Sequence, residues 1–474
     1  MSIKGNELVR VPSSFKPFPV YYQRAARYRP SPSRNDNSSG RYLVLAQAEQ
    51  RGENDHMLRI PTLLLFSALS SLASWPQYHG PLFDKSTASL LSPSPQGWLP
   101  NAPAWTQPTP LGFSSMTTDK NSAYTLIALE DENGLLREVC LALDLATGAQ
   151  RWKSWLGLAS YGHGGGNAGT SANSGGDGPR STPSIEEGRI FIYDSQMVLH
   201  CLSAHTGQQI WKADMIREYG GTHIMWKNAS SPLLVDQRVI VYGGGKKQSF
   251  IAFEQSTGKV AWKSGSEVPT HATPSLASIH GRKQAVFLCH SGMVSVDVKT
   301  GGELWRQAFP FKVSSAASPV ICGNRVFCSA GYGVGSALYE IVEEGGIFRS
   351  VEVWRKRNEL VNHWSTPLFY KGYLYGIFGF KEYGKAPLQC VELESGDIQW
   401  SKEGFGPGNL IRSGNALFIL SDDGQLVVAE ANPQHYAEQY RKKLLSGKCW
   451  STPTVSDDFL LIRSTVEAVA LPLD

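Results

Sequence analysis

Side chains that could bind a ligand recur along this sequence at one relative position, a few residues before a Ser-Pro or Thr-Pro pair. The members of this set are Arg180, Asn228, His271, Ser315, His363, Trp364, Lys448 and Trp450. Each Pro opens an apolar run, so each side chain would stand at the start of a β-strand. If these strands converge, Arg, His and Trp side chains from distant parts of the chain form a polar pocket with aromatic walls. The alternation of side chains along strands offers the other outcome, in which half of the set lies in interfaces between sheets.

A glycine-rich segment is the second candidate for a functional surface. It runs from Tyr161 to Arg180 and carries eight Gly in twenty residues, with no apolar periodicity. Such a composition is typical of a loop, which we expect to lie over one face of the protein. Its Asn, Ser and Asp side chains could reach a ligand, but no strand–helix context marks it as a phosphate-binding loop. The sequence also contains no HExxH, Walker or GxSxG motif.

The elements that would carry these residues repeat along the chain. The Gly of a Thr-Gly pair stands four residues before Trp in "TGAQRW", "HTGQQIW", "TGKVAW" and "TGGELW", and Ser replaces Thr in "SGDIQW". The repeated Trp residues are 152, 211, 262, 305, 354 and 400, at intervals of 43 to 59 residues. The Ser/Thr-Pro pair keeps a similar spacing, with Pro at 183, 232, 274, 319, 367 and 453. Segments near Gly112 and Asn409 fill two further places, which gives eight units.

Each unit has the pattern of four strands. Pro opens the first strand, β-branched and aromatic residues fill the next two, and the Thr-Gly turn leads into a short fourth strand with the Trp. Gly supplies the positive φ that a tight turn needs. A unit of this size cannot bury both faces of its own sheet, so it is repeated until a ring closes. We expect each Trp to be a wedge between adjacent units.

These patterns predict an all-β fold, an eight-bladed β-propeller of four-stranded antiparallel blades. The last unit ends at "VEAVALPLD" without a fourth strand, and a spare Trp strand, "NAPAWTQPT", lies around Trp105. Pairing of these N- and C-terminal strands would close the ring and leave no exposed edge in the eighth blade. One segment departs from the pattern, because "QHYAEQYRKKLL" follows Asn432-Pro433 where a Thr-Gly turn is expected. We interpret it as an irregular excursion with helical character.

Charge and cysteine content narrow the class of protein. The net charge of +4 comes entirely from residues 1–56, which hold nine basic and five acidic residues. The rest of the chain is neutral, so nothing favours nucleic acid as a partner. The seven Cys form no CxxC pair, and an odd number argues against a full disulfide framework. Five of them lie in apolar runs, where we expect small buried side chains: Cys140, Cys201, Cys289, Cys328 and Cys390.

Residues 57–74 have the pattern of a secretory signal peptide. A positive start is followed by an apolar run, Leu63 to Leu72, and then by small residues. The run is too short to span a bilayer. We therefore predict that Met57 is the true start, that residues 1–56 are a mis-called or disordered extension, and that residues 75–474 form the propeller. The alternative is a buried apolar strand after a disordered basic tail.

The Thr-Gly-x-x-x-Trp unit resembles the repeat of β-propellers of the pyrroloquinoline quinone (PQQ) type. That repeat occurs in quinoprotein alcohol dehydrogenases and in a non-enzymatic lipoprotein of the outer-membrane β-barrel assembly machine. Four segments look like a secreted bacterial, planctomycete-type subgroup of these proteins: "WPQYHGP" from Trp75, "GDGPRSTPS" from Gly176, "NHWSTPL" from Asn362 and "GKCWSTPTV" from Gly447. The resemblance covers roughly residues 75–474.

The resemblance leaves two functions open. The quinoprotein enzymes bind PQQ at the channel mouth with a disulfide of adjacent Cys, a stacking Trp and a calcium ion held by Glu and Asn, and they use Asp as a base. This sequence has no Cys-Cys pair and no CxxCH haem motif. The first function is therefore a periplasmic or secreted binding or scaffold module for a protein or glycan partner, without catalysis.

The alternative is a PQQ- and calcium-dependent oxidoreductase that acts on an alcohol or a sugar. Its cofactor-binding candidates are the side chains expected at the mouth, namely Arg180, Asn228, His271, His363, Trp364 and Trp450. No metal ligands can be assigned from the sequence. We expect a monomer without a membrane span.

Overall fold

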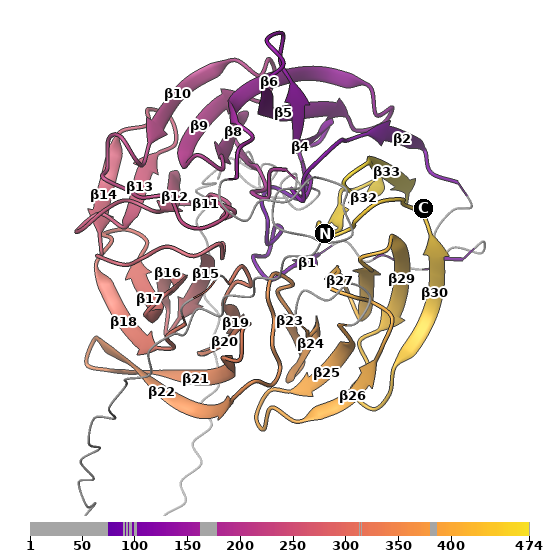
Figure 1. Ribbon diagram of the computed structural model, residues 1–474. Coiled ribbons are helices and arrows are strands. Elements are labelled where there is room, and N and C mark those ends of the chain that lie inside the picture. The colour runs from indigo at the N-terminus through magenta and orange to yellow at the C-terminus, as the bar shows by residue number, and fades with distance from the viewer. Residues whose placement is uncertain are drawn as a thin grey trace, which may run out of the picture. The chain divides into compact units, whose positions relative to one another are not determined.

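The computed structural model shows eight β-sheets arranged as blades around one axis (Figure 1). The structure describes residues 74–473 apart from 89–90, 92, 94–96, 99–101, 162–177, 312, 314 and 380–385. The predicted extension and all but the last residue of the predicted signal peptide lie outside the described residues, as does most of the glycine-rich segment. The described part of the chain is built of strands. Nowhere in it is there a helix of the length and apolar character needed to cross a membrane.

The first four blades follow one another along the chain, each with four antiparallel strands. Blade 1 consists of β3 (Thr117–Thr118), β4 (Ser122–Glu130), β5 (Leu136–Asp144) and β6 (Gln150–Leu158). Blade 2 consists of β7 (Ser184–Glu186), β8 (Arg189–Tyr193), β9 (Val198–Ser203) and β10 (Gln209–Asp214). Blade 3 consists of β11 (Leu233–Val235), β12 (Arg238–Tyr242), β13 (Phe250–Glu254) and β14 (Val260–Ser264). Blade 4 consists of β15 (Ser275–Ile279), β16 (Arg282–Cys289), β17 (Gly292–Asp297) and β18 (Glu303–Ala308).

The last four blades include two strands from the N-terminal part of the chain. Blade 5 consists of β19 (Val320–Cys322), β20 (Arg325–Ala330), β21 (Gly335–Glu344) and β22 (Ile347–Lys356). Blade 6 consists of β23 (Leu368–Tyr370), β24 (Tyr373–Ile377), β25 (Leu388–Glu392) and β26 (Ile398–Lys402). Blade 7 consists of β27 (Asn409–Ser413), β28 (Ala416–Leu420), β29 (Gln425–Glu430) and β30 (Ala437–Lys443), with β1 (Ser86–Thr87) parallel to β27. Blade 8 consists of β31 (Thr454–Val455), β32 (Phe459–Arg463), β33 (Glu467–Pro472) and β2 (Trp105–Pro108).

The ring closes as the sequence predicts. Strand β2 pairs antiparallel with β33, so that Trp105 lies opposite Ala470 and Thr106 opposite Val469. Figure 1 shows this N-terminal strand beside the C-terminal strand in the same blade. The eighth blade thereby gains its fourth strand, and Trp105 fills the place that a Trp occupies in most other blades. The predicted fold, including its closure, is confirmed.

The prediction of helical character after Asn432 is wrong. The segment forms β30, the outermost strand of blade 7, with Tyr440 opposite Val428. This is the register position of Trp152 and Trp211 in blades 1 and 2. An outermost strand has one face in water, so polar residues fill half of its positions and hide the strand pattern.

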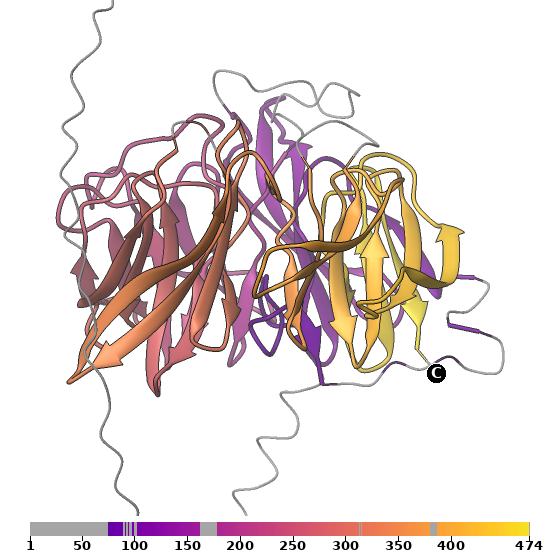
Figure 2. The same ribbon diagram turned by 90° about the horizontal axis from the view of Figure 1, so that it is seen from below.

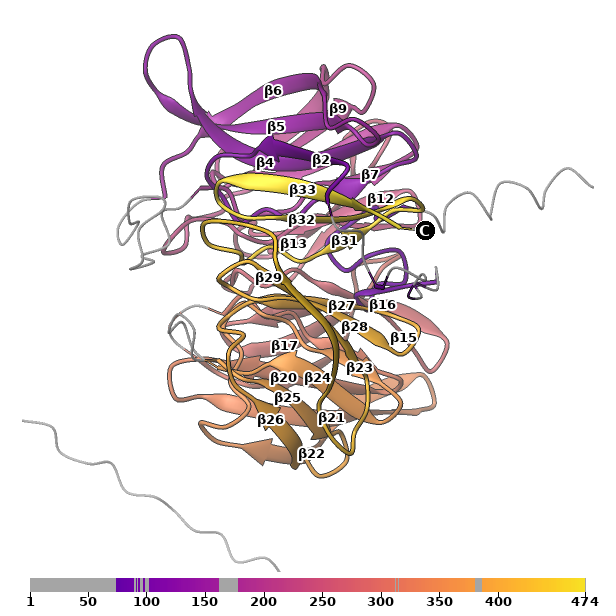
Figure 3. The same ribbon diagram turned by 90° about the vertical axis from the view of Figure 1, so that its right-hand side faces the viewer.

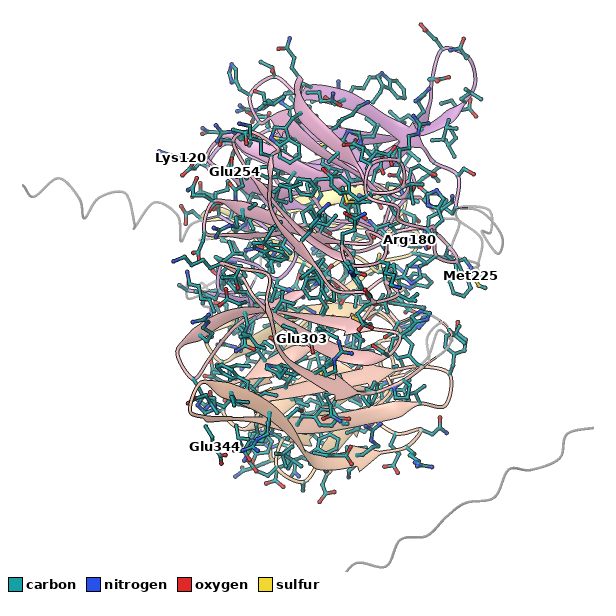
Figure 4. All side chains as sticks on the ribbon, turned by 90° about the vertical axis from the view of Figure 1, so that its left-hand side faces the viewer. Lys120, Arg180, Met225, Glu254, Glu303 and Glu344 are labelled. Atoms are coloured by element: carbon teal, nitrogen blue, oxygen red, sulfur yellow. The ribbon has the colours of Figure 1, made fainter. Side chains whose placement is uncertain are left out.

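The short first strand of each blade lines the axis, and all the blades run between the same two faces (Figures 2 and 3). We call the face that carries the residues before these first strands the mouth face. We call the opposite face, which carries the Thr-Gly turns, the turn face. Figure 4 shows Arg180 and Met225 at the mouth face, and Lys120 and Glu254 at the turn face.

Five Trp side chains pack against the Gly of the Thr-Gly or Ser-Gly turn in the next blade. A Cβ on that Gly would come within 2.4–3.0 Å of the Trp ring at five interfaces: Gly148 with Trp105, Gly207 with Trp152, Gly258 with Trp211, Gly301 with Trp262, and Gly396 with Trp354. All five Gly also have φ of 70–73°. The turn therefore requires Gly for two reasons: its backbone has a positive φ, and the Trp ring of the neighbouring blade leaves no room for a Cβ. The prediction that each Trp is a wedge between blades is confirmed at these interfaces.

These five Trp side chains and Trp400 also join the blades by hydrogen bonds. The indole N–H donates to a backbone carbonyl just before the turn of the next blade: Trp105 to Leu145 (2.9 Å), Trp152 to Ala204 (2.9 Å), Trp211 to Gln255 (2.9 Å), Trp262 to Val298 (3.0 Å), Trp354 to Leu393 (2.8 Å) and Trp400 to Asn432 (2.7 Å). A buried indole N–H needs such an acceptor. The repeated six residues are therefore one half of a joint whose other half lies in the next blade.

Candidate functional site

A belt of hydroxyl groups fixes the strand starts from which the candidate site is built. At five strand starts, a backbone N–H donates to the hydroxyl at the same position of the next blade: Ser115 to Thr182 (3.0 Å), Thr182 to Ser231 (2.9 Å), Ser231 to Thr273 (3.0 Å), Ser318 to Thr366 (2.9 Å) and Thr452 to Ser115 (2.8 Å). Ser115 holds this position in blade 1, and in the other four cases the donor is the residue before the Pro. Sequence reasoning used the Ser/Thr-Pro pair only as a marker of strand starts. The belt explains why the first residue of the pair carries a hydroxyl, and it holds the preceding residues in place at the mouth.

The channel inside this belt is filled by the chain itself. Residues 74–88, which we call the plug, run along the inner strands. Trp75 exchanges two hydrogen bonds with the end of β3 (2.9 and 3.0 Å), and β1 adds to the axial side of β27. Burial raises the pKa of the Tyr78 hydroxyl, which lies close to Thr452 and Thr366, two members of the belt. The "WPQYHGP" segment thus has a physical role that the sequence did not reveal.

An aromatic stack covers one side of the mouth. Trp450 lies between Phe113, at 4.5 Å between ring centroids, and Trp364, at 4.3 Å. The stack continues through His363, 4.7 Å from Trp364, to Tyr332, 5.4 Å from His363. These residues come from blades 1, 8, 6 and 5 or their connections. The structure therefore brings three predicted residues into one cluster and adds two that the prediction missed.

The two indoles of this stack differ in their hydrogen bonding. The N–H of Trp364 donates to the carbonyl of Pro407 at 2.9 Å. The N–H of Trp450 has no acceptor among the described residues, although only 8% of this side chain is exposed. A buried donor without an acceptor costs about 1–3 kcal/mol, and a ligand that accepts this bond would recover that energy. The ammonium of Lys448 lies 5.6 Å from the Trp450 ring centroid.

Arg180 and His271 lie on the other side of the mouth, where they hold a loop. The guanidinium of Arg180 donates to the carbonyl of Trp226 and covers the ring of Tyr161 at 5.1 Å. The imidazole of His271 donates from Nε2 to the carbonyl of Met225 at 3.0 Å. Burial lowers the pKa of His271 to about 3, with further lowering by the charges of Arg180 and His363. The imidazole is therefore neutral at ordinary pH.

Two of the candidate residues have structural roles. The amide of Asn228 donates to the carbonyls of Tyr193, Asp194 and Ser230 (3.1–3.2 Å), and its oxygen accepts from Ser230 N–H. Ser315 is buried, and its carbonyl accepts from the N–H of His271 at 3.0 Å. Asn228 therefore connects its own blade to blade 2. The binding role of all the candidate residues stays a prediction.

A buried acidic pair under the mouth was missed by sequence reasoning. Glu138 accepts hydrogen bonds from the hydroxyl of Tyr161 (2.9 Å) and the N–H of Ser195 (3.0 Å). Burial, together with the nearby charge of Asp194, raises the pKa of Glu138 to about 7. Asp194 in turn lies 3.1 Å from Nε2 of His200. The available signal was an acid at the start of the apolar run "EVCLALD", where Glu138 directly precedes Val139.

The described residues do not match the cofactor set of a quinoprotein. All seven cysteines are free and buried, so none of them forms the ring disulfide. Among the described residues, no three side chains of His, Cys, Asp or Glu are grouped as metal ligands. The described residues of the mouth offer a stacking Trp without a group of acidic side chains that could hold calcium. We therefore derive no chemical step through quinone or calcium.

Comparison with known proteins agrees with the architecture. BamB from Moraxella catarrhalis superimposes with a TM-score of 0.53 at 12% identity, over 79% of this chain and 98% of that one. Quinohemoprotein alcohol dehydrogenase from Comamonas testosteroni gives 0.58 at 11% identity, over 87% and 82%. These likenesses show the fold alone, and no curated protein sequence matches the chain. The family model for outer membrane protein assembly factor BamB, however, matches residues 137–402, more than half of the sequence. The chain therefore belongs to this family of PQQ-like β-propellers.

Proposed function

We propose that this propeller is a binding module that recognises an acidic segment of a partner protein at its mouth face. The observation that supports the proposal is the aromatic stack of Trp364 and Trp450 beside the cationic side chain of Lys448, with Arg180 across the mouth. Indole faces and N–H groups bind flat or acidic groups, and cations favour negative charge. The family name, an assembly factor, favours a protein partner.

The filled channel supports binding at the mouth surface over catalysis within the channel. Tyr78 of the plug lies close to Thr366 and Thr452 of the hydroxyl belt. In the sequence, these two residues follow Trp364 and Trp450 of the aromatic stack by two positions. A ligand at the mouth would therefore rest on a floor made by the chain itself. Rigid aromatic platforms of this kind bind with little loss of side-chain entropy.

Fluorescence anisotropy with labelled probes tests the proposal on the full chain. The probes are a Glu-rich peptide that contains Tyr, a neutral peptide of equal length, and a carboxylated oligosaccharide. We expect the acidic peptide to bind and its affinity to fall at least about tenfold in Trp364→Leu, since one hot-spot aromatic contributes about 2 kcal/mol or more. The matched control is Trp211→Leu, which removes a half-buried Trp far from the mouth.

Each outcome decides between functions. Equal affinity for the acidic and neutral peptides, or no loss in Trp364→Leu, would refute the proposal. Binding of the oligosaccharide alone would replace the protein partner with a glycan. The oxidoreductase alternative is tested by adding PQQ and calcium: a shifted quinone absorbance with reduction of a dye in the presence of an alcohol would favour it.

A further inference from the structure

A small cavity lies between the plug and the inner strands of blades 4, 5 and 6. Its volume is about 20 Å³, enough for one water-sized particle. Among its lining residues, three are ionisable: His79, Asp84 and Lys85, all from the plug. The inner strands contribute Ser275, Thr366 and apolar side chains. The cavity is separate from the aromatic stack at the mouth, so a ligand in the cavity is independent of the proposed function.

Lys85 brings a buried amine to this cavity. Only 1% of the residue is exposed, and within the described part of the chain its amine donates one hydrogen bond, to the carbonyl of Thr366 at 2.7 Å. Burial lowers its pKa to about 7, so the ammonium form is substantially populated at neutral pH. An ammonium carries three donors and a charge, and a single neutral carbonyl satisfies neither in full.

Asp84 does not serve as the counter-ion. One carboxylate oxygen accepts from the N–H and the hydroxyl of Ser86, at 2.9 and 2.6 Å. The other lies 4.0 Å from the guanidinium of Arg412, and 44% of the side chain is exposed. The negative charge of Asp84 is therefore engaged outside the buried space and screened by water.

His79 adds a second donor. It is 5% exposed, and its Nε2 has no partner among the described residues. Burial, reinforced by the charge of Lys85, lowers the pKa of His79 to about 3, so the imidazole is neutral. A neutral imidazole carries one N–H, which Nε2 can present to an acceptor. The plug thus offers an ammonium and an imidazole N–H to one small space.

We propose that this cavity is a binding site for a monovalent inorganic anion of about the size of chloride, held between Nζ of Lys85 and Nε2 of His79. Such an ion supplies the missing counter-charge and accepts both hydrogen bonds, whereas a water molecule supplies no charge. A single-atom anion matches a cavity that holds one water-sized particle. Both proposed ligands of the ion belong to the plug, and Lys85 also donates to the carbonyl of Thr366 in blade 6, so the ion would stabilise the plug where it meets that blade.

Chloride NMR and thermal unfolding of the full chain test the site. At constant ionic strength, the ³⁵Cl line should broaden with the unsubstituted protein and with Lys259→Met, a control at an exposed lysine of the turn face. Broadening should be lost in Lys85→Met. Replacing gluconate by about 100 mM chloride should raise the Tm of the unsubstituted protein by about 2–4 °C, because only the folded state binds the ion.

The proposal is overturned by broadening that survives in Lys85→Met, by an equal Tm rise with sulfate, or by no chloride effect, which would leave a water only. If Lys85→Met does not fold, crystals of the unsubstituted protein grown in bromide decide the question. An anomalous bromide peak within hydrogen-bonding distance of Nζ of Lys85 supports the site. A map of the folded plug without that peak refutes it.

Discussion

Two neighbouring interfaces of the ring solve the same packing problem in different ways. Between blades 3 and 4, Trp262 lies on Gly301 and donates to the carbonyl of Val298 at 3.0 Å. Between blades 4 and 5, Trp305 is also buried but donates within its own blade, to Oε1 of Gln284 at 2.6 Å. The first joint is repeated around the ring, and the second needs an additional side chain.

The difference follows from the turn that each Trp meets. Blade 5 has no Thr-Gly turn, since β21 and β22 extend to a hairpin at Gly345 and Gly346, and a Cβ on either Gly would meet nothing within 4 Å. Ile341 holds the register position that Val298 holds in blade 4. Its carbonyl accepts from Nε2 of His280 at 2.7 Å. Both polar groups of the missing joint have thus found other partners.

The comparison teaches that the buried polar groups of a joint must always be paired, whereas the residues that pair them can differ. A buried indole N–H and a buried carbonyl must each be paired, because an unpaired one costs about 1–3 kcal/mol. The Thr-Gly-x-x-x-Trp unit satisfies both with one contact. Where blade 5 has a longer hairpin, Gln284 accepts the hydrogen bond of the indole, and His280 donates to the carbonyl.

Substitution of Gly301 gives the largest expected effect. Gly301→Ala adds strain at a φ of 73° and places a Cβ 2.4 Å from the Trp262 ring. We expect a loss of about 3 kcal/mol or more in the free energy of unfolding, from the backbone strain and the displaced indole together. Urea denaturation followed by circular dichroism measures it.

Gly281 provides the matched control for this prediction. It has the same φ of 73°, and a Cβ there would meet nothing within 4 Å. Gly281→Ala should therefore cost only the backbone strain, about 1–2 kcal/mol. Equal losses in the two variants would show that the Trp–Gly contact contributes nothing to the joint.

The second prediction compares the two Trp residues directly. Trp262→Phe leaves the buried carbonyl of Val298 without its donor, and we expect a loss of about 2 kcal/mol. Trp305→Phe should cost about 1 kcal/mol, because Oε1 of Gln284 still accepts from the hydroxyl of Ser295 at 2.6 Å. The same urea titration of the two variants checks the order. A larger loss for Trp305→Phe would mean that the substitute joint is the stronger one.

The regular joints could be predicted from the sequence, and the substituted one could not. The strand-opening segments, six with a Ser/Thr-Pro pair and two near Gly112 and Asn409, predict the number of blades. The spare strand at Trp105 predicts the closure, because each sheet must bury its faces and its edge. The pairing of Trp305 with Gln284 depends on how far β21 extends. No local pattern in the sequence records that distance.

The candidate site divides in the same way. The residues before the Ser/Thr-Pro pairs were expected at one mouth, and the aromatic stack contains three of them, His363, Trp364 and Trp450. The plug was not foreseen, since a segment without a repeat pattern gives no periodic signal. Its place depends on contacts with strands hundreds of residues away, such as that of Lys85 with Thr366.

The smallest expected effect is an interaction between two substitutions in the altered joint. Gln284→Met leaves two buried donors without an acceptor, the indole of Trp305 and the hydroxyl of Ser295. Adding Trp305→Phe removes one of those donors. The loss in the free energy of unfolding of the double variant should therefore be smaller than the sum of the two single losses by about 1 kcal/mol. A cycle of Gln284→Met with Trp400→Phe, in blade 6, should be additive, because these residues share no partner. If the two cycles give the same value, Gln284 is a packing residue only, and the joint between blades 4 and 5 is held by apolar contacts and His280.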